Sequence, residues 1–289
     1  MKYDDRAGLD PSQMGGGGRR PSPALALGGG AGAIVVIVIA LLFGVDPGQV
    51  LQGGAGPAPG PATSTPFAQC TSGADIGRDR DCRFVAFTNS IQAYWAGADP
   101  GYQEIDVDTF EGSVSTGCGA ATSEVGPFYC PADTTVYLDL GFFDQLTTQL
   151  GARGGDAAEA YVLAHEFGHH VQNLDGTMAE VQGSGQGTGP TSAGVRLELQ
   201  ADCYAGVWFH HAVDDPDDAI SEVSQDDLDR AVDAAAAVGD DRIQEKARGQ
   251  VTPESWTHGS AANRQKWLTT GFTSGDPNAC DTFKAGAVS

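Results

Sequence analysis

The residues with the clearest chemical pattern are His165, Glu166 and His169, in the run His-Glu-Phe-Gly-His. Two histidines four positions apart lie about 40° apart around a helix, so both imidazole rings can bind one metal ion. Glu166 lies at the rim of the same face, where its carboxylate can take a proton from a water activated by the metal. The motif therefore predicts a hydrolytic zinc site.

A catalytic zinc ion needs a third protein ligand, because three protein groups and an open position are usual. Glu198 and Asp202 are four residues apart in a largely apolar run, where a carboxylate is costly to bury unless it is paired or metal-bound. We expect Glu198 to be the ligand and Asp202 to accept the spare N–H of a zinc-bound histidine. The alternatives are Asp202 as the ligand and a purely structural carboxylate pair.

Hydrolysis of an amide also needs a group that stabilises the negative charge developing on the carbonyl oxygen. His258 and Tyr204 are the polar side chains that we consider for this role, with a structural role as the alternative for each. Glu166 would finally pass its proton to the leaving nitrogen.

Helices must position these residues. The apolar positions around the motif recur three and four residues apart, as on one buried face of a helix. They are Ala160, Ala164, Phe167, Val171 and Leu174. We expect a helix over residues 156–174, with both histidines on another face, and a buried helix over residues 195–212 that carries Glu198.

The remaining pattern is mostly helical, with a small β element. The strand expected over residues 134–140 is either an edge that pairs with an extended substrate or an ordinary sheet strand. Residues 118–130 look like a disulfide-tied loop, and residues 181–194 like a mobile Gly-rich loop. Further helices are expected over residues 83–95, 141–150, 226–238 and 253–271.

Residues 24–45 carry no charge and are long enough to cross a bilayer, since about 20 apolar residues span its core as a helix. Four basic residues precede this stretch, so the positive-inside rule predicts a cytoplasmic leader over residues 1–23 and an extracytoplasmic domain. We expect residues 24–45 to be a retained transmembrane anchor. A Pro/Gly-rich linker over residues 46–66 would lead to the zinc metallopeptidase domain, residues 67–289.

The six cysteines all follow the apolar stretch, and none forms a CxxC pair. An even number predicts disulfides in an oxidising compartment. Six cysteines allow about fifteen connectivities, of which sequence order favours one. The favoured pairs are Cys70–Cys82, Cys118–Cys130 and Cys203–Cys280.

The chain is strongly acidic, with a formal net charge of −22 from 38 acidic and 16 basic residues. Nucleic acid is bound mainly through Lys and Arg, so this balance argues against nucleic acid as a partner.

Three segments, HEFGHHVQ, RLELQADCYAG and THGSAANRQKW, together resemble the putative neutral zinc metallopeptidase family of bacteria, over residues 67–272. More distantly, the HExxH motif with a later E-x-x-A-D is similar to membrane zinc peptidases of the prenyl-protein-processing type. In those, the Glu of the later motif is the third ligand and the Asp orients a histidine. The resemblance implies these roles for Glu198 and Asp202, with Zn²⁺ as the cofactor.

The predicted fold is α+β and mostly helical, a zincin-like metallopeptidase core with a small β element, preceded by one transmembrane helix. The predicted function is a membrane-anchored zinc-dependent peptidase that acts on peptide or protein substrates with Glu166 as general base. A catalytically silent zinc-containing binding or scaffold protein of the envelope is the alternative. The presence of Glu166 favours the enzyme, because a protein that has lost catalytic activity can lose its general base and still keep its metal.

Overall fold

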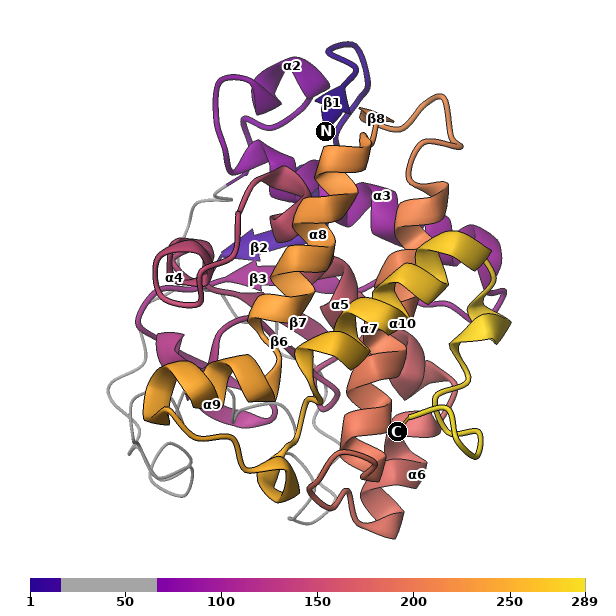
Figure 1. Cartoon of the computed structure of the whole chain (residues 1–289). Coiled ribbons are helices and arrows are strands. Elements are labelled where there is room, and N and C mark those ends of the chain that lie inside the picture. Colours follow the sequence, from indigo (N-terminus) through magenta and orange to yellow (C-terminus); the bar gives the residue numbers. More distant parts are fainter. Residues whose placement is uncertain (17–66, 289) are drawn as a thin grey trace.

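The computed structural model describes residues 1–16 and 67–288, and it is mostly helical with small sheets (Figure 1). The largest sheet has the order β2-β3-β7-β6. β2 and β3, and β3 and β7, pair in parallel, whereas β6 pairs antiparallel with β7 and forms one edge. These strands are β2 (Met14–Gly16), β3 (Asp106–Thr109), β6 (Phe128–Cys130) and β7 (Thr135–Leu138).

The remaining strands of the described residues form two smaller sheets. β4 (Ser113–Thr116) and β5 (Gly119–Thr122) form an antiparallel hairpin. β1 (Lys2–Tyr3) pairs antiparallel with β8 (Ile220–Glu222).

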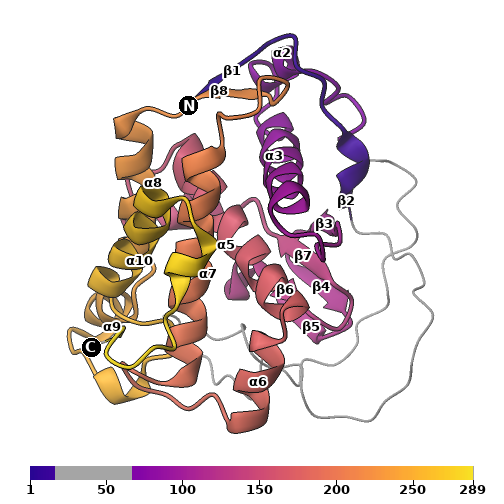
Figure 2. The same cartoon turned by 90° about the vertical axis from the view of Figure 1, so that its right-hand side faces the viewer.

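Helix α5 lies between the largest sheet and a second layer of helices (Figure 2), contacting β6 on one side and α7 and α8 on the other. The long helices are α3 (Cys82–Ala98), α5 (Asp156–Leu174), α7 (Ala193–His211), α8 (Gln225–Ala237) and α10 (Ala261–Ser274). The short ones are α2 (Gly73–Ile76), α4 (Phe142–Thr148), α6 (Thr177–Ser184) and α9 (Asp240–Arg248).

Glycines allow these helices to approach closely. A Cβ on Gly271 of α10 would lie 1.9 Å from the carbonyl oxygen of Cys203 in α7, and one on Gly206 would lie 2.1 Å from that of Leu268. A Cβ on Gly168 of α5 would lie 3.0 Å from the Cα of Ala201 in α7. A Cβ would clash with backbone at Gly206 and Gly271 and would be tightly packed at Gly168, so the backbones of α5, α7 and α10 pack against one another.

The helices predicted over residues 83–95, 141–150, 156–174, 195–212 and 226–238 are confirmed, with ends shifted by a few residues. The helix predicted over residues 253–271 begins later, at Ala261, after the 3₁₀ turn Pro253–Ser255. The mobile loop predicted over residues 181–194 is wrong at both ends, because residues up to Ser184 belong to α6 and residues from Ala193 belong to α7.

One prediction about this region is also wrong, because residues 118–130 are not one loop but contain β5 and β6. The strand predicted over residues 134–140 is confirmed as β7. Of its two alternatives it is the ordinary sheet strand, since it lies between β3 and β6 and not at an edge. All three disulfides join the cysteines that sequence order favours: Cys70–Cys82, Cys118–Cys130 and Cys203–Cys280.

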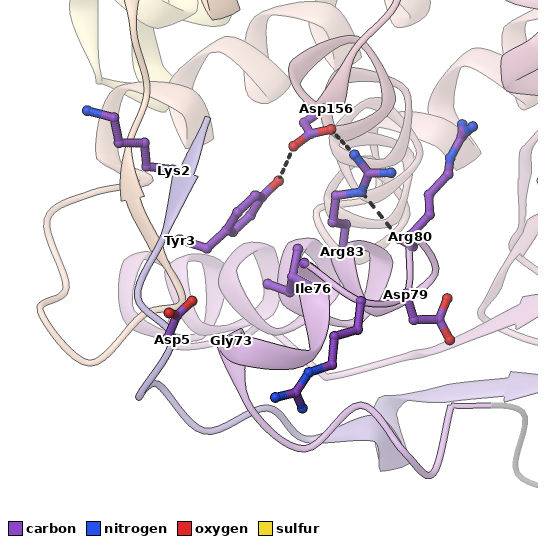
Figure 3. A pocket seen from close by; sticks show the side chains of 11 residues that line it. Lys2, Tyr3, Asp5, Gly73, Ile76, Asp79, Arg80, Arg83 and Asp156 are labelled. Carbon is purple, nitrogen blue, oxygen red and sulfur yellow. Dashed lines mark hydrogen bonds and ion pairs between the residues drawn. The ribbon is translucent and has the colours of Figure 1, made fainter.

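Residues 1–16 belong to the domain, although the sequence pattern assigns them to a separate leader. Leu9 and Met14 are buried in the main core, and β1 and β2 extend two of the sheets. Figure 3 shows a surface pocket beside this segment, where the hydroxyl of Tyr3 donates to Asp156 at 2.8 Å and Arg83 pairs with the same carboxylate. The domain therefore does not begin at Phe67.

The anchor predicted over residues 24–45 and the linker over residues 46–66 lie outside the described residues. Among the residues that the structure describes, no helix is both long enough and apolar enough to cross a membrane.

Candidate active site

Helices α5 and α7 bring His165, His169 and Glu198 together in the interior. One ligand atom from each lies within 4.8 Å of the others, and all three side chains are buried. The Nε2 atom of His165 is 3.3 Å from Glu198 Oε2, and that of His169 is 3.6 Å from Glu198 Oε1. The close approach of the two helices at Gly168 gives this spacing.

The side chains of this cluster fit a zinc ion. Among the described residues, Nε2 of His169 and one carboxylate oxygen each of Glu166 and Glu198 are buried without a hydrogen-bond partner. Buried polar atoms are normally satisfied, so such a group of unsatisfied atoms calls for a ligand. Two imidazoles and one carboxylate are a typical donor set for catalytic zinc.

His165 is oriented by a buried carboxylate on the next helix. Its Nδ1 lies 2.9 Å from Asp202 Oδ1, which also accepts from the hydroxyl of Tyr161 at 2.6 Å. Arg264 of α10 donates to both oxygens of Asp202, each at 2.8 Å. With both oxygens engaged in this way, Asp202 orients His165 and lies outside the group of three ligands.

His169 is oriented by an amide on its own helix. Its Nδ1 lies 2.9 Å from the side-chain oxygen of Gln172. The amide nitrogen of Gln172 donates to the carbonyl of Leu197 at 2.7 Å and to Gln200 at 3.0 Å. This arrangement ties the histidine ring to α7 and leaves Nε2 for the metal.

Three of these orienting residues are missing from the sequence prediction. Tyr161 precedes His165 by four positions and Gln172 follows His169 by three, so helical spacing could have indicated both. Arg264 reaches the site from a helix far along the chain, and only its place in the segment THGSAANRQKW drew attention to it.

Glu166 is buried at the rim of this cluster. Burial raises the pKa of its carboxyl group, and the charges of His165 and His169 lower it in part. The backbone N–H of Tyr129 in β6 also lowers the pKa of this carboxyl group. A glutamate with a raised pKa is suited to take and return a proton near neutral pH.

The pKa values of His165 and Glu198 each result from two opposing effects. Burial lowers the pKa of His165, but its hydrogen bond to Asp202 and the Glu198 carboxylate 3.3 Å away outweigh burial and raise the pKa to about 9. Burial raises the pKa of Glu198, yet the charges of His258 and His169 hold it well below its usual value. The site is thus built to keep Glu198 ionised.

His258 belongs to the same buried region. It is 5% exposed, its charge acts on Glu198, and its Nδ1 lies 2.7 Å from the hydroxyl of Thr257 and 3.6 Å from Asp240. Tyr204 does not join this group, since it lies on a different face of α7 from Glu198. It packs against Trp95, with 5.4 Å between the ring centroids.

Comparison with known proteins identifies the family. The family model described as "Putative neutral zinc metallopeptidase" matches residues 2–283. "Uncharacterized protein Rv2575" of Mycobacterium tuberculosis is 51% identical over 252 residues, which are 85% of either chain. "Uncharacterized protein YpfJ" of Escherichia coli K12 is 47% identical over 185 residues, 63% of this chain and 62% of its own. No solved structure matches the chain. The chain therefore belongs to the putative neutral zinc metallopeptidase family.

Proposed function

We propose that the chain is a zinc-dependent peptidase that hydrolyses peptide bonds of peptide or protein substrates. The observation that carries this proposal is the buried group of His165, His169 and Glu198, with a carboxylate oxygen of Glu166 unsatisfied beside it. His165, His169 and Glu198 would hold the zinc ion, and membership of a family named for zinc metallopeptidases supports the assignment.

When bound, a zinc ion at such a site lowers the pKa of water and polarises a carbonyl group. Glu166 takes the proton from the attacking water and then gives it to the leaving nitrogen. Asp202 and Gln172 hold the two imidazole rings in place. We assign to His258 the stabilisation of the negative charge on the carbonyl oxygen, because it is buried near Glu198 and held by Asp240.

The edge of the sheet at β6 is the place where an extended peptide would pair. β6 hydrogen-bonds to β7 on one side only, and α5 with Glu166 lies against it. Peptides commonly bind by adding a strand to such an edge. The strand that pairs with substrate is therefore β6 and not β7, because β7 is an interior strand.

We further propose that the domain works in an oxidising compartment outside the cytoplasm. Its three disulfides support this location, because disulfides persist where thiols are not kept reduced. Attachment to a membrane through residues 24–45 rests on the sequence prediction.

The test uses the purified full chain, so that residues 1–16 are kept. Zinc content and cleavage of a peptide library are measured for the wild type, Glu166→Gln, Glu198→Ala and the control Glu180→Gln, an exposed acidic residue of α6. We expect one zinc ion and cleavage in the wild type and the control. Glu166→Gln should keep its zinc while its activity falls about 10²–10⁴-fold, and Glu198→Ala should lose zinc.

A protein that binds zinc but cleaves no peptide would favour the alternative, a zinc-containing binding or scaffold protein of the envelope. The unsatisfied carboxylate of Glu166 favours the enzyme, because a structural zinc site has no need of a buried base. A wild type without zinc would overturn the assignment of the metal ligands.

A further inference from the structure

Three polar side chains lie along one face of α5, and the first of them is the candidate base. Glu166, His170 and Asn173 are four and three positions apart, so they lie on one side of the helix. Strand β6 packs against α5. The question is what holds an edge strand of three residues at a fixed position on this face.

Tyr129, the central residue of β6, makes the connection through its hydroxyl group. The amide nitrogen of Asn173 donates to the Tyr129 oxygen at 2.9 Å, and this hydroxyl lies 3.0 Å from Nδ1 of His170. The Nε2 atom of His170 lies 2.7 Å from the carbonyl oxygen of Gln103.

The positions of the protons in this chain of hydrogen bonds follow from the groups at its two ends. The carbonyl of Gln103 can only accept, so Nε2 of His170 carries the proton and Nδ1 of the neutral ring accepts from Tyr129. The Tyr129 oxygen in turn accepts from Asn173. Tyr102 packs edge-on against the His170 ring at 5.3 Å between ring centroids. The imidazole is therefore fixed between β6 and the segment that precedes β3.

The backbone of Tyr129 faces the base while its side chain makes these bonds. Tyr129 lies opposite Val136 of β7, and β6 is the last strand of the sheet. The backbone N–H of Tyr129 lowers the pKa of the Glu166 carboxyl group, which indicates that the two groups lie close together.

We propose that Tyr129, His170 and Asn173 act as positioning residues, a clamp that fixes the edge strand β6 over the Glu166 face of α5. The clamp sets where Glu166 lies relative to the strand edge on which a peptide would pair. This inference rests on the proposed peptidase function, but the docking of β6 can be measured without it.

The test compares Tyr129→Phe with Tyr137→Phe in the full chain loaded with zinc. Both changes remove one hydroxyl from a buried ring, and that of Tyr137 donates to Asp133 at 2.8 Å, on the interior strand β7. Amide hydrogen exchange of residues 128–130, zinc content, kcat and KM are measured for each. Asn173→Ala, which removes a single donor, is the milder variant.

For Tyr129→Phe we expect exchange in β6 to become faster and kcat to fall about tenfold, with KM and zinc content unchanged. Asn173→Ala should change both quantities less, and Tyr137→Phe should leave both at their wild-type values. Equal effects of Tyr129→Phe and Tyr137→Phe, or β6 exchange unaffected by Tyr129→Phe, would overturn the clamp. If the wild type cleaves no peptide while exchange still responds only to the clamp variants, the proposed function fails and the clamp stands.

Discussion

At the scale of single residues, the site depends on a buried ion pair one layer away from the metal ligands. Asp202 has no exposed surface and Arg264 is 3% exposed. Burial alone would raise the pKa of Asp202, but the charge of Arg264 and the bond with His165 hold it below its usual value. The pair keeps an ionised carboxylate next to His165, although each charge alone would be costly to bury.

Replacing Arg264 by Lys should weaken zinc binding about 10–100-fold, the usual effect of losing a partner of a metal ligand. Lysine keeps the charge but cannot donate two parallel N–H groups to Asp202. Zinc affinity is measured by competition with a chelator. Arg248→Lys, at the exposed end of α9, is the control and should leave the affinity unchanged. Equal affinities in the two variants would show that Asp202 orients His165 without Arg264.

Asp240 provides a pH-dependent contribution to stability. Its Oδ2 accepts the backbone N–H groups of Thr257, His258 and Gly259 at 2.9, 2.7 and 2.9 Å. Burial raises the pKa of Asp240, but the interactions with His258 and these N–H groups outweigh it and lower the pKa. The lowered pKa means that this stabilisation is present above the unfolded pKa of about 3.9 and is lost as pH falls through the folded value.

Asp240→Asn should therefore lower the free energy of unfolding by about 2 kcal/mol at neutral pH, since an ionised acceptor is replaced by a neutral one. The difference between variant and wild type should shrink as pH falls below about 4. Urea unfolding of the metal-free proteins across this pH range measures it. A difference that stays constant with pH would exclude the carboxylate as its source.

The buried group of two histidines and a glutamate could be predicted from the sequence because two short helical spacings carry it. The i, i+4 pair of His165 and His169 is local, and Glu198 is marked by its apolar surroundings. Arg264 and Asp240 could not be assigned, because their partners Asp202 and His258 lie 62 and 18 residues away along the chain. Such contacts arise only in the folded chain, when α10 packs against α7 and the start of α9 meets the loop that precedes α10.

At the scale of the elements, the approach of α7 to α10 depends on the two glycines at their crossing. Gly271→Ala should lower the free energy of unfolding by about 2–3 kcal/mol, because its Cβ would meet backbone and not a movable side chain. Gly97→Ala is the matched control, since Gly97 is also helical but has open space around its Cβ position. It should raise stability by about 0.5–1 kcal/mol. Urea denaturation measures both, and effects of the same sign would contradict the close packing.

The elements that sequence patterns miss are those without an apolar rhythm of their own. Most of α9 is charged, and its start is held by the bonds of Asp240. β6 is three residues long and fully buried, so it lacks the alternation that marks a longer strand. By contrast the sequence predicts α5 over its full length, because apolar residues recur on one face from Ala160 to Leu174.

At the scale of the whole molecule, the core includes side chains from the first residues of the chain. Met14 is 2% exposed, so Met14→Ala should lower the free energy of unfolding by about 2–5 kcal/mol. Arg6→Ala, where the side chain is almost fully exposed, is the control and should change it by less than about 0.5 kcal/mol. Thermal or urea unfolding of the full chain measures the difference. Equal stabilities would mean that residues 1–16 do not pack on the domain in solution.

The parallel pairing of β2 with β3 also constrains the path of the polypeptide. It joins residues 14–16 to residues 107–109, so the intervening chain leaves the sheet and must return to it. A path that crosses a bilayer once would leave its two ends on opposite faces, where these strands could not meet. We therefore expect residues 1–16 and 67–288 to lie in one aqueous compartment whenever β2 and β3 are paired.

Sidedness can be read directly with a membrane-impermeant thiol reagent. Cysteines placed singly at the exposed positions Arg6 and Asp217 should be labelled from the same side of sealed cells or vesicles. Labelling from opposite sides would mean that the strand pairing forms only after the chain is released from the bilayer. In either case the side of the membrane on which residues 1–16 lie, and not the chemistry of the proposed zinc site, decides when the sheet can close.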